Sequence, residues 1–195
     1  MKSKFRPYIL VLTAVIVIVL AAAVWIVNAR SAKIVNEPVE TLVNHFMTWK
    51  AGPWREGMDM DNPYRQAMVE RSEQVVPYIL ENPPGMSLEM IWLLGEIGDT
   101  RCFDILLKEY RKQPGSVRAC SLAACTDKDN IGRLLDALND FDKNSLLKLL
   151  DKPFSDGKTY DEVKNFDNDQ LQKWWAEHLD EIRQRCMERC TPQLG

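Results

Sequence analysis

Cysteine is the residue type in this chain whose number and spacing could support chemistry. Two of the five cysteines, Cys186 and Cys190, are four residues apart, so a helix would carry both on one face. A regular helix holds such a pair too far apart for an unstrained disulfide, although a frayed helix end would let them bridge. Cys120 and Cys125 are also close in sequence, near the end of another predicted helix, and Cys102 is the fifth.

Three roles stay open for Cys120, Cys125, Cys186 and Cys190. The first is a structural disulfide, whose connectivity is not readable because four cysteines allow three pairings. The second is that they are small buried thiols packed between helices. The third is a redox pair of Cys186 and Cys190. Their spacing disfavours it, because Cys-x-x-Cys is the arrangement that lowers a thiol pKa at a helix N-terminus.

The other reactive residue types predict no catalytic, cofactor or metal site. His178 could share a broad helix face with Cys186 and Cys190, but two thiols and one imidazole on a single helix do not surround a tetrahedral ion. His45 is isolated, and the acidic residues are scattered over helix faces. The sequence also has no phosphate-binding glycine loop and no nucleophile elbow. We therefore expect a protein without enzymatic activity.

The N-terminal region contains an uncharged run, Tyr8–Val27, of 20 residues, 13 of which are Leu, Ile or Val. As a helix it would be about 30 Å long, the thickness of the bilayer core. Its aliphatic residues favour insertion by about 4–8 kcal/mol. The run therefore predicts a single transmembrane helix at 8–27. A cleaved signal peptide is the alternative, since small residues at 21–23 follow an apolar stretch.

Charges beside this run predict its orientation. Lys2, Lys4 and Arg6 precede it, so the positive-inside rule places the N-terminus in the cytoplasm and the rest of the chain outside. We expect a single-pass protein of the inner (plasma) membrane with a periplasmic or extracellular C-terminal domain. Residues 31–195 carry 21 basic and 28 acidic side chains, a net charge of −7. This acidic body argues against nucleic acid as a partner, because phosphate binding needs a basic face.

A repeat with a period of 28 residues organises the middle of the chain. The segment 91–99 (IWLLGEIGD) is echoed by 119–127 (ACSLAACTD), and the match continues through the apolar positions that follow. A fixed period below 50 residues is typical of stacked-repeat folds. The aligned apolar positions predict the repeat core, which consists of Leu94, Phe103, Leu106, Leu107, Leu122, Ile131, Leu134 and Leu135.

Turn residues separate the predicted helices. Ser87 and Ser116 are expected to cap the first helix of each repeat. Gly98 suits the left-handed position after a helix, and Asp99 then caps the next helix, so the two connect a helix pair with almost no loop. Helices are predicted at 39–50, 64–71, 72–82, 88–97, 117–125, 129–138 and 170–189, with another beginning at 145–150.

The motif Leu-Gly-Glu-Ile-Gly-Asp at 94–99, followed by the apolar helix at 103–107, resembles the short HEAT-like repeat of bacterial proteins. The segment 75–80 resembles the second helix of the preceding unit, and the resemblance covers about 63–150. The resemblance implies an α-solenoid used for binding or scaffolding. A tail segment around Trp174 and Trp175 is similar to a double-Trp segment at the ends of such proteins, and we expect it to cap the last repeat's open apolar face.

Together these features predict an all-α protein, a short HEAT-like solenoid preceded by one transmembrane helix. Its parts are a cytoplasmic basic tail at 1–7, the signal-anchor helix at 8–27, a linker at 28–38, an N-terminal helix and loop at 39–62, the repeats at 63–150, and a turn with the capping helix at 151–195. We expect a membrane-anchored scaffold for a protein or peptide partner. The alternatives are a thiol redox component using Cys186 and Cys190, or a structural spacer of an envelope complex.

Overall fold

The computed structural model describes residues 13, 15–22, 34, 36–49, 62–149 and 154–190. Among these residues there are helices, turns and loops but no strand, so the all-α prediction is confirmed. No helix in these ranges is long and apolar enough to cross a membrane. The predicted span at 8–27 lies partly outside the described residues, as do the basic tail at 1–7 and most of the linker at 28–38.

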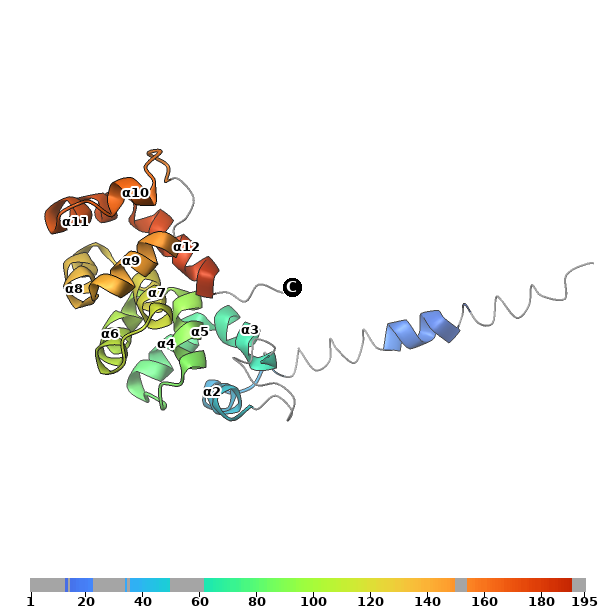
Figure 1. Cartoon of the computed structure of the whole chain (residues 1–195). Helices are drawn as coiled ribbons and strands as arrows, with labels where there is room; N and C mark the ends of the chain where they lie inside the picture. The colour runs from blue at the N-terminus through green and yellow to red at the C-terminus, as the bar shows by residue number, and fades with distance from the viewer. Residues whose placement is uncertain are drawn as a thin grey trace, which may run out of the picture.

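Most of the described helices from α3 to α9 and from α10 to α12 follow one another through short connections (Figure 1). In chain order they are α2 Val39–Thr48, α3 Pro63–Glu70, α4 Ser72–Glu81, α5 Leu88–Ile97, α6 Phe103–Lys112, α7 Ser116–Ala124, α8 Ile131–Ala137, α9 Asp140–Leu149, α10 Tyr160–Val163, α11 Asn168–Glu177 and α12 Leu179–Cys190. Two 3-10 turns, η1 Thr100–Cys102 and η2 Lys128–Asn130, precede α6 and α8.

These helices stack in two layers. One layer runs through α3, α5, α7 and α9, each packed on the next, and the other contains α6 and α8, which contact each other and lie against or beside α7. The pairs α5/α6 and α7/α8 are the two copies of the 28-residue repeat. This arrangement is compatible with the predicted α-solenoid. All eight residues expected in the repeat core are buried, from Leu94 and Leu122 to Ile131 and Leu135.

The turn between α5 and α6 has the geometry that its residues predict. Ser87 accepts a hydrogen bond from the Met90 N–H at 3.2 Å, and so caps α5. Gly98 ends α5 in the left-handed conformation, with φ +66°. Asp99 then accepts the Arg101 N–H at 2.9 Å. Hydrogen bonds from Arg101 also hold the pKa of the Asp99 carboxyl below its usual value.

The predicted cap at Ser116 is wrong. Helix α7 already includes Ser116, its N-cap is Gly115, and no side chain caps it. Gly115 has an extended backbone, with φ 165° and ψ 152°, which brings the chain into the helix without a capping side chain. The next expected helix, at 145–150, begins earlier, at Asp140, because the Asn139 side chain accepts the Asp142 N–H at 2.7 Å and starts α9 there.

The predicted single helix at 170–189 is two helices. Helix α11 ends at Glu177, and α12 starts at Leu179, with His178 between them. The His178 imidazole Nδ1 lies 2.9 Å from the Trp174 carbonyl oxygen and its Nε2 lies 3.4 Å from the Asp156 carboxylate. These contacts turn the chain, so that α12 returns across α5 and α7 instead of continuing past the last repeat (Figure 1).

Helices α5 and α7 approach very closely where Gly95 faces Ser121. A Cβ added to Gly95 would lie 2.6 Å from the Ser121 Oγ and 2.8 Å from the Ser121 Cα. The second contact is with a backbone atom, so rotating a side chain cannot relieve it. Glycine is therefore required at position 95 by the spacing of the two helices, although glycine weakens a helix.

We expect Gly95→Ala to lower the free energy of unfolding by about 1–2 kcal/mol, because overpacking outweighs the gain in helix propensity. Gly132→Ala in α8 is the matched control. Its added Cβ would meet only the end of the Gln172 side chain, at 3.4 Å, so it should leave stability unchanged or raise it by about 0.5–1 kcal/mol. Urea unfolding followed by circular dichroism measures both, and equal effects would contradict the close contact.

Candidate functional site

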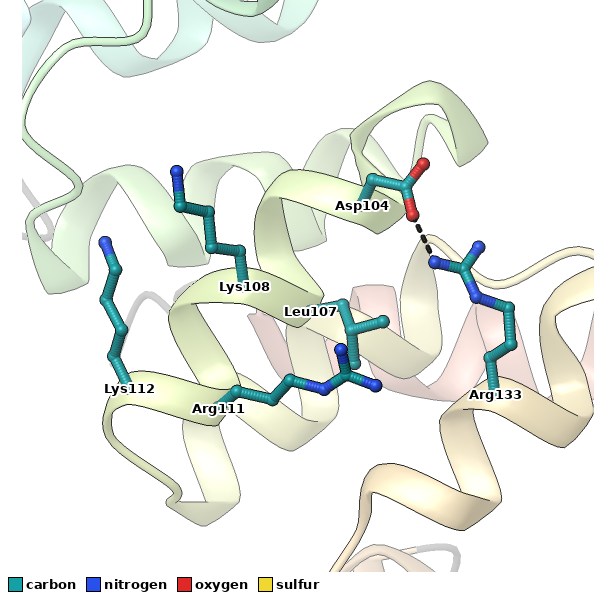
Figure 2. A pocket seen from close by; sticks show the side chains of 6 residues that line it. All are labelled: Asp104, Leu107, Lys108, Arg111, Lys112 and Arg133. Atoms are coloured by element: carbon teal, nitrogen blue, oxygen red, sulfur yellow. Dashed lines mark hydrogen bonds and ion pairs between the residues drawn. The ribbon is translucent and has the colours of Figure 1, made fainter.

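A groove on the surface of α6 and α8 is a candidate binding site in the described part of the chain. Its volume is about 480 Å³. Leu107 is the buried apolar residue of the lining, and the other lining side chains are exposed and charged: Asp104, Lys108, Arg111, Lys112 and Arg133. We call this set the basic groove. Figure 2 shows Lys108 and Lys112 projecting from α6 while Arg111 reaches past Leu107 toward α8.

Two of the four cations in the basic groove already have acidic partners. Arg133 from α8 pairs with Asp104 from α6 at 2.5 Å, which joins the two repeats (Figure 2), and its guanidinium lies 5.1 Å from the centre of the Phe103 ring. Lys112 pairs with Glu109 at 2.5 Å. By contrast, the side chains of Lys108 and Arg111 form no hydrogen bond or ion pair with any residue that the structure describes.

The basic groove is positively charged, whereas the body around it carries a net negative charge. Residues 31–195 carry a net charge of −7, yet the groove brings together four cations and one carboxylate. Unpaired cations beside one largely buried apolar side chain, Leu107, suit an anionic ligand. The lining is dominated by charged side chains, an arrangement suited to electrostatic binding of a ligand.

The basic groove is not predicted from the sequence, although one signal for it is present there. Lys108, Arg111 and Lys112 are spaced three and four residues apart, which places them on one face of a helix. Their relation to Arg133 in the next repeat was not visible, because it depends on how α8 packs beside α6.

The structure gathers three of the predicted cysteines in one place. Cys120 on α7 interacts with the side chains of Cys186 and Cys190 on α12. The Cys120 Sγ also lies 3.5 Å from the Cys186 carbonyl oxygen, and the Cys190 Sγ lies 3.6 Å from the Ser121 Oγ. Cys125, which the sequence grouped with Cys120, instead points its thiol at the Leu94 carbonyl oxygen, 3.3 Å away.

All five cysteines are buried and carry free thiols. The interaction with Cys186, together with burial, raises the pKa of the Cys120 thiol well above its usual value. Likewise, interaction with Cys120 and burial raise the pKa of Cys190, and burial raises the pKa of Cys102 to about 12. These are the surroundings of unreactive thiols. Among the described residues, no group of three His, Cys, Asp or Glu side chains is placed to hold a metal ion.

The paired tryptophans pack against other residues of the chain. Helix α11, which carries Trp174 and Trp175, lies against α8, the second helix of the last complete repeat. Both indole side chains are buried. Trp174 meets the Phe154 ring edge-on at 4.5 Å between centroids, and its Nε1–H donates to Asp156 at 3.3 Å. This position is compatible with the predicted capping role, and neither indole ring is exposed for stacking on a ligand.

Comparison of the chain with protein-family models, with curated proteins and with solved structures finds no match. The HEAT-like relationship therefore stays a prediction, based on the repeat motif and compatible with the two-layer packing.

The Asp104–Arg133 pair should reduce the attraction of the basic groove for anions. We expect Asp104→Asn to raise the affinity for a hexaglutamate peptide by about 2–5-fold at low salt, because one nearby negative charge is removed. Stability should change by less than about 1 kcal/mol, since the pair is exposed. Fluorescence anisotropy measures the affinity. Asp180→Asn, an equal charge change on α12, is the control, and a similar gain there would assign the effect to net charge alone.

Proposed function

We propose that this chain is a membrane-anchored HEAT-like scaffold whose exported body binds an acidic segment of a protein partner in the basic groove. The observation that carries this proposal is the presence of Lys108 and Arg111 without acidic partners, beside the apolar Leu107, on a body with a net negative charge. Charged side chains on such a body would ordinarily be balanced by its own carboxylates. A partner carboxylate is the natural complement.

The packing of the helices also favours the basic groove as the binding surface. Helix α12 covers α5 and α7, and α11 covers α8 on one side. The charged faces of α6 and α8 stay open to solvent, as the exposed lining of the basic groove shows. A volume of about 480 Å³ fits a few side chains of an extended peptide and is within the usual range of ligand sites. The interface would therefore be of peptide size.

The alternative of a thiol redox component has less support. Its two cysteines, Cys186 and Cys190, are about 1% exposed, and the pKa of Cys190 is raised. A redox thiol needs access and a lowered pKa. Both observations favour a structural role for this pair.

Reversing the two unpaired charges tests the binding proposal. The full chain in detergent is titrated with a labelled peptide of three glutamates, one leucine and three glutamates. We expect Lys108→Glu with Arg111→Glu to weaken binding by about 10-fold or more, and a rise from 50 to 500 mM salt to weaken wild-type binding strongly.

Lys128→Glu with Lys173→Glu is the matched control. Both lysines are exposed and lie outside the basic groove, and the change in net charge is the same. This control variant should lose no more than about 2–3-fold in affinity for the peptide. That loss is the part due to long-range electrostatic attraction. Equal losses in the two double variants, or binding of anionic lipid vesicles without binding of the peptide, would overturn the proposal.

The proposed membrane topology, with the body outside the cytoplasm, can be tested separately. In intact spheroplasts, protease added from outside should degrade the body and leave a short fragment that contains the N-terminal run at 8–27. Full protection of residues 31–195, with digestion only after the membrane is broken, would contradict export. A shortened mature N-terminus would instead identify a cleaved signal peptide.

A further inference from the structure

The contact between α7 and α12 brings three thiols together from distant parts of the sequence. Cys120 is separated from Cys186 by 66 residues along the chain, yet its Sγ lies 3.5 Å from the Cys186 carbonyl oxygen. The Cys190 Sγ lies 3.6 Å from the Oγ of Ser121, the residue that follows Cys120. The three cysteines are 3%, 1% and 1% exposed. The close packing of α12 on α7 holds them in place, so the arrangement does not depend on a mobile loop.

We propose that Cys120 forms a disulfide with one of the two α12 cysteines, Cys190 or Cys186, and that this bond fastens the C-terminal helix to the repeats. A bond within α12 is disfavoured, because Cys186 and Cys190 stay one turn apart in an unbroken helix. Cys120 faces both of them from another helix, where the side chains can meet without unwinding α12. The inter-helix bond is therefore the one that we propose.

The reaction needs an electron acceptor, and a protein disulfide of a thiol–disulfide oxidoreductase supplies one. The thiolate of Cys190, at the end of α12, attacks a sulfur of that disulfide and forms a mixed disulfide, and one thiol of the oxidant leaves. The Cys120 thiolate then attacks the Cys190 sulfur and expels the second thiol. Two electrons and two protons pass to the oxidant, which ends as a dithiol. Cys186 can exchange with Cys190 in the product.

Burial determines when this reaction occurs. In the docked state the three thiols are out of reach of a protein oxidant, and the surroundings of Cys120 and Cys190 raise the pKa of these two thiols and so disfavour their thiolates. Oxidation therefore accompanies folding, while α12 is still undocked, and the finished bond is protected from reduction. The inference rests on the proposed function only for the export of the body into an oxidising compartment, and it does not involve the basic groove.

Tryptic peptides can identify the bond. Cleavage after Arg185 and Arg189 separates Cys186 from Cys190, while Cys120 and Cys125 share the peptide 119–128. The full chain is isolated from its own membrane with thiols blocked in acid, and its unreduced peptides are mapped by mass spectrometry. A second sample is refolded in mixed oxidised and reduced glutathione. We expect peptide 119–128 joined to 186–189 or to 190–195 in both samples, with fragmentation assigning Cys120.

Stability supplies an independent readout. The oxidised wild-type chain should unfold at a midpoint about 5–10 °C above the same chain that has been reduced with a phosphine in denaturant and refolded with its thiols kept reduced. Cys120→Ser should abolish this difference, whereas Cys102→Ser, another buried cysteine, should retain it. Comparing each variant with its own reduced form keeps the test valid even if a substitution itself weakens packing.

Three results would overturn the inference. They are a bond between Cys186 and Cys190, free thiols at all three positions after glutathione refolding, and equal unfolding midpoints of the oxidised and reduced chain. A bond that forms on refolding but is absent from the chain isolated from its membrane would overturn the disulfide together with the export on which it rests. Peptide binding by the basic groove would not be affected by that result.

Discussion

The packing of α12 across α5 and α7 is the contact on which the rest of the body depends, and two arginines hold it. Arg183 of α12 donates to the carbonyl oxygens of Gly98 at 2.7 Å and Ala124 at 3.1 Å, at the C-terminal ends of α5 and α7. Arg65 of α3 donates to the carbonyl oxygen of Cys190 at 2.7 Å, at the end of α12. Helix ends leave carbonyls without partners and carry partial negative charge. The Arg183 guanidinium can donate to carbonyl oxygens of both repeats because Gly95 lets α5 and α7 approach so closely.

Because of this contact, one layer of helices is covered and the other keeps an exposed face. The layer of α5 and α7 is covered by α12, and its interior holds the thiols and apolar side chains. The layer of α6 and α8 keeps an exposed, charged face, where the basic groove lies. A protein whose C-terminal helix had instead continued past the last repeat would expose both layers. The turn at His178 is therefore what confines the open surface to one side.

Electrostatics and burial give the two sites opposite properties. In the basic groove, cations lie in water, where their attraction for a ligand is long-ranged and salt-dependent. At the α7–α12 contact, thiols lie out of water, where burial and mutual interaction raise the pKa of Cys120 and suppress its nucleophilicity. The first environment suits recognition of a partner. The second suits a permanent structural element.

The sequence alone determined the local features of this protein. Capping by Ser87, the left-handed turn at Gly98 and the apolar positions of the 28-residue repeat follow from residue type and spacing, which act within one or two helical turns. Other features depended on contacts between distant residues. The break at His178 relies on Asp156, the thiol cluster relies on α12 returning to Cys120, and the basic groove relies on α8 placing Arg133 beside Asp104. Only the tertiary structure decided these, because each joins side chains whose proximity no local pattern in the chain encodes.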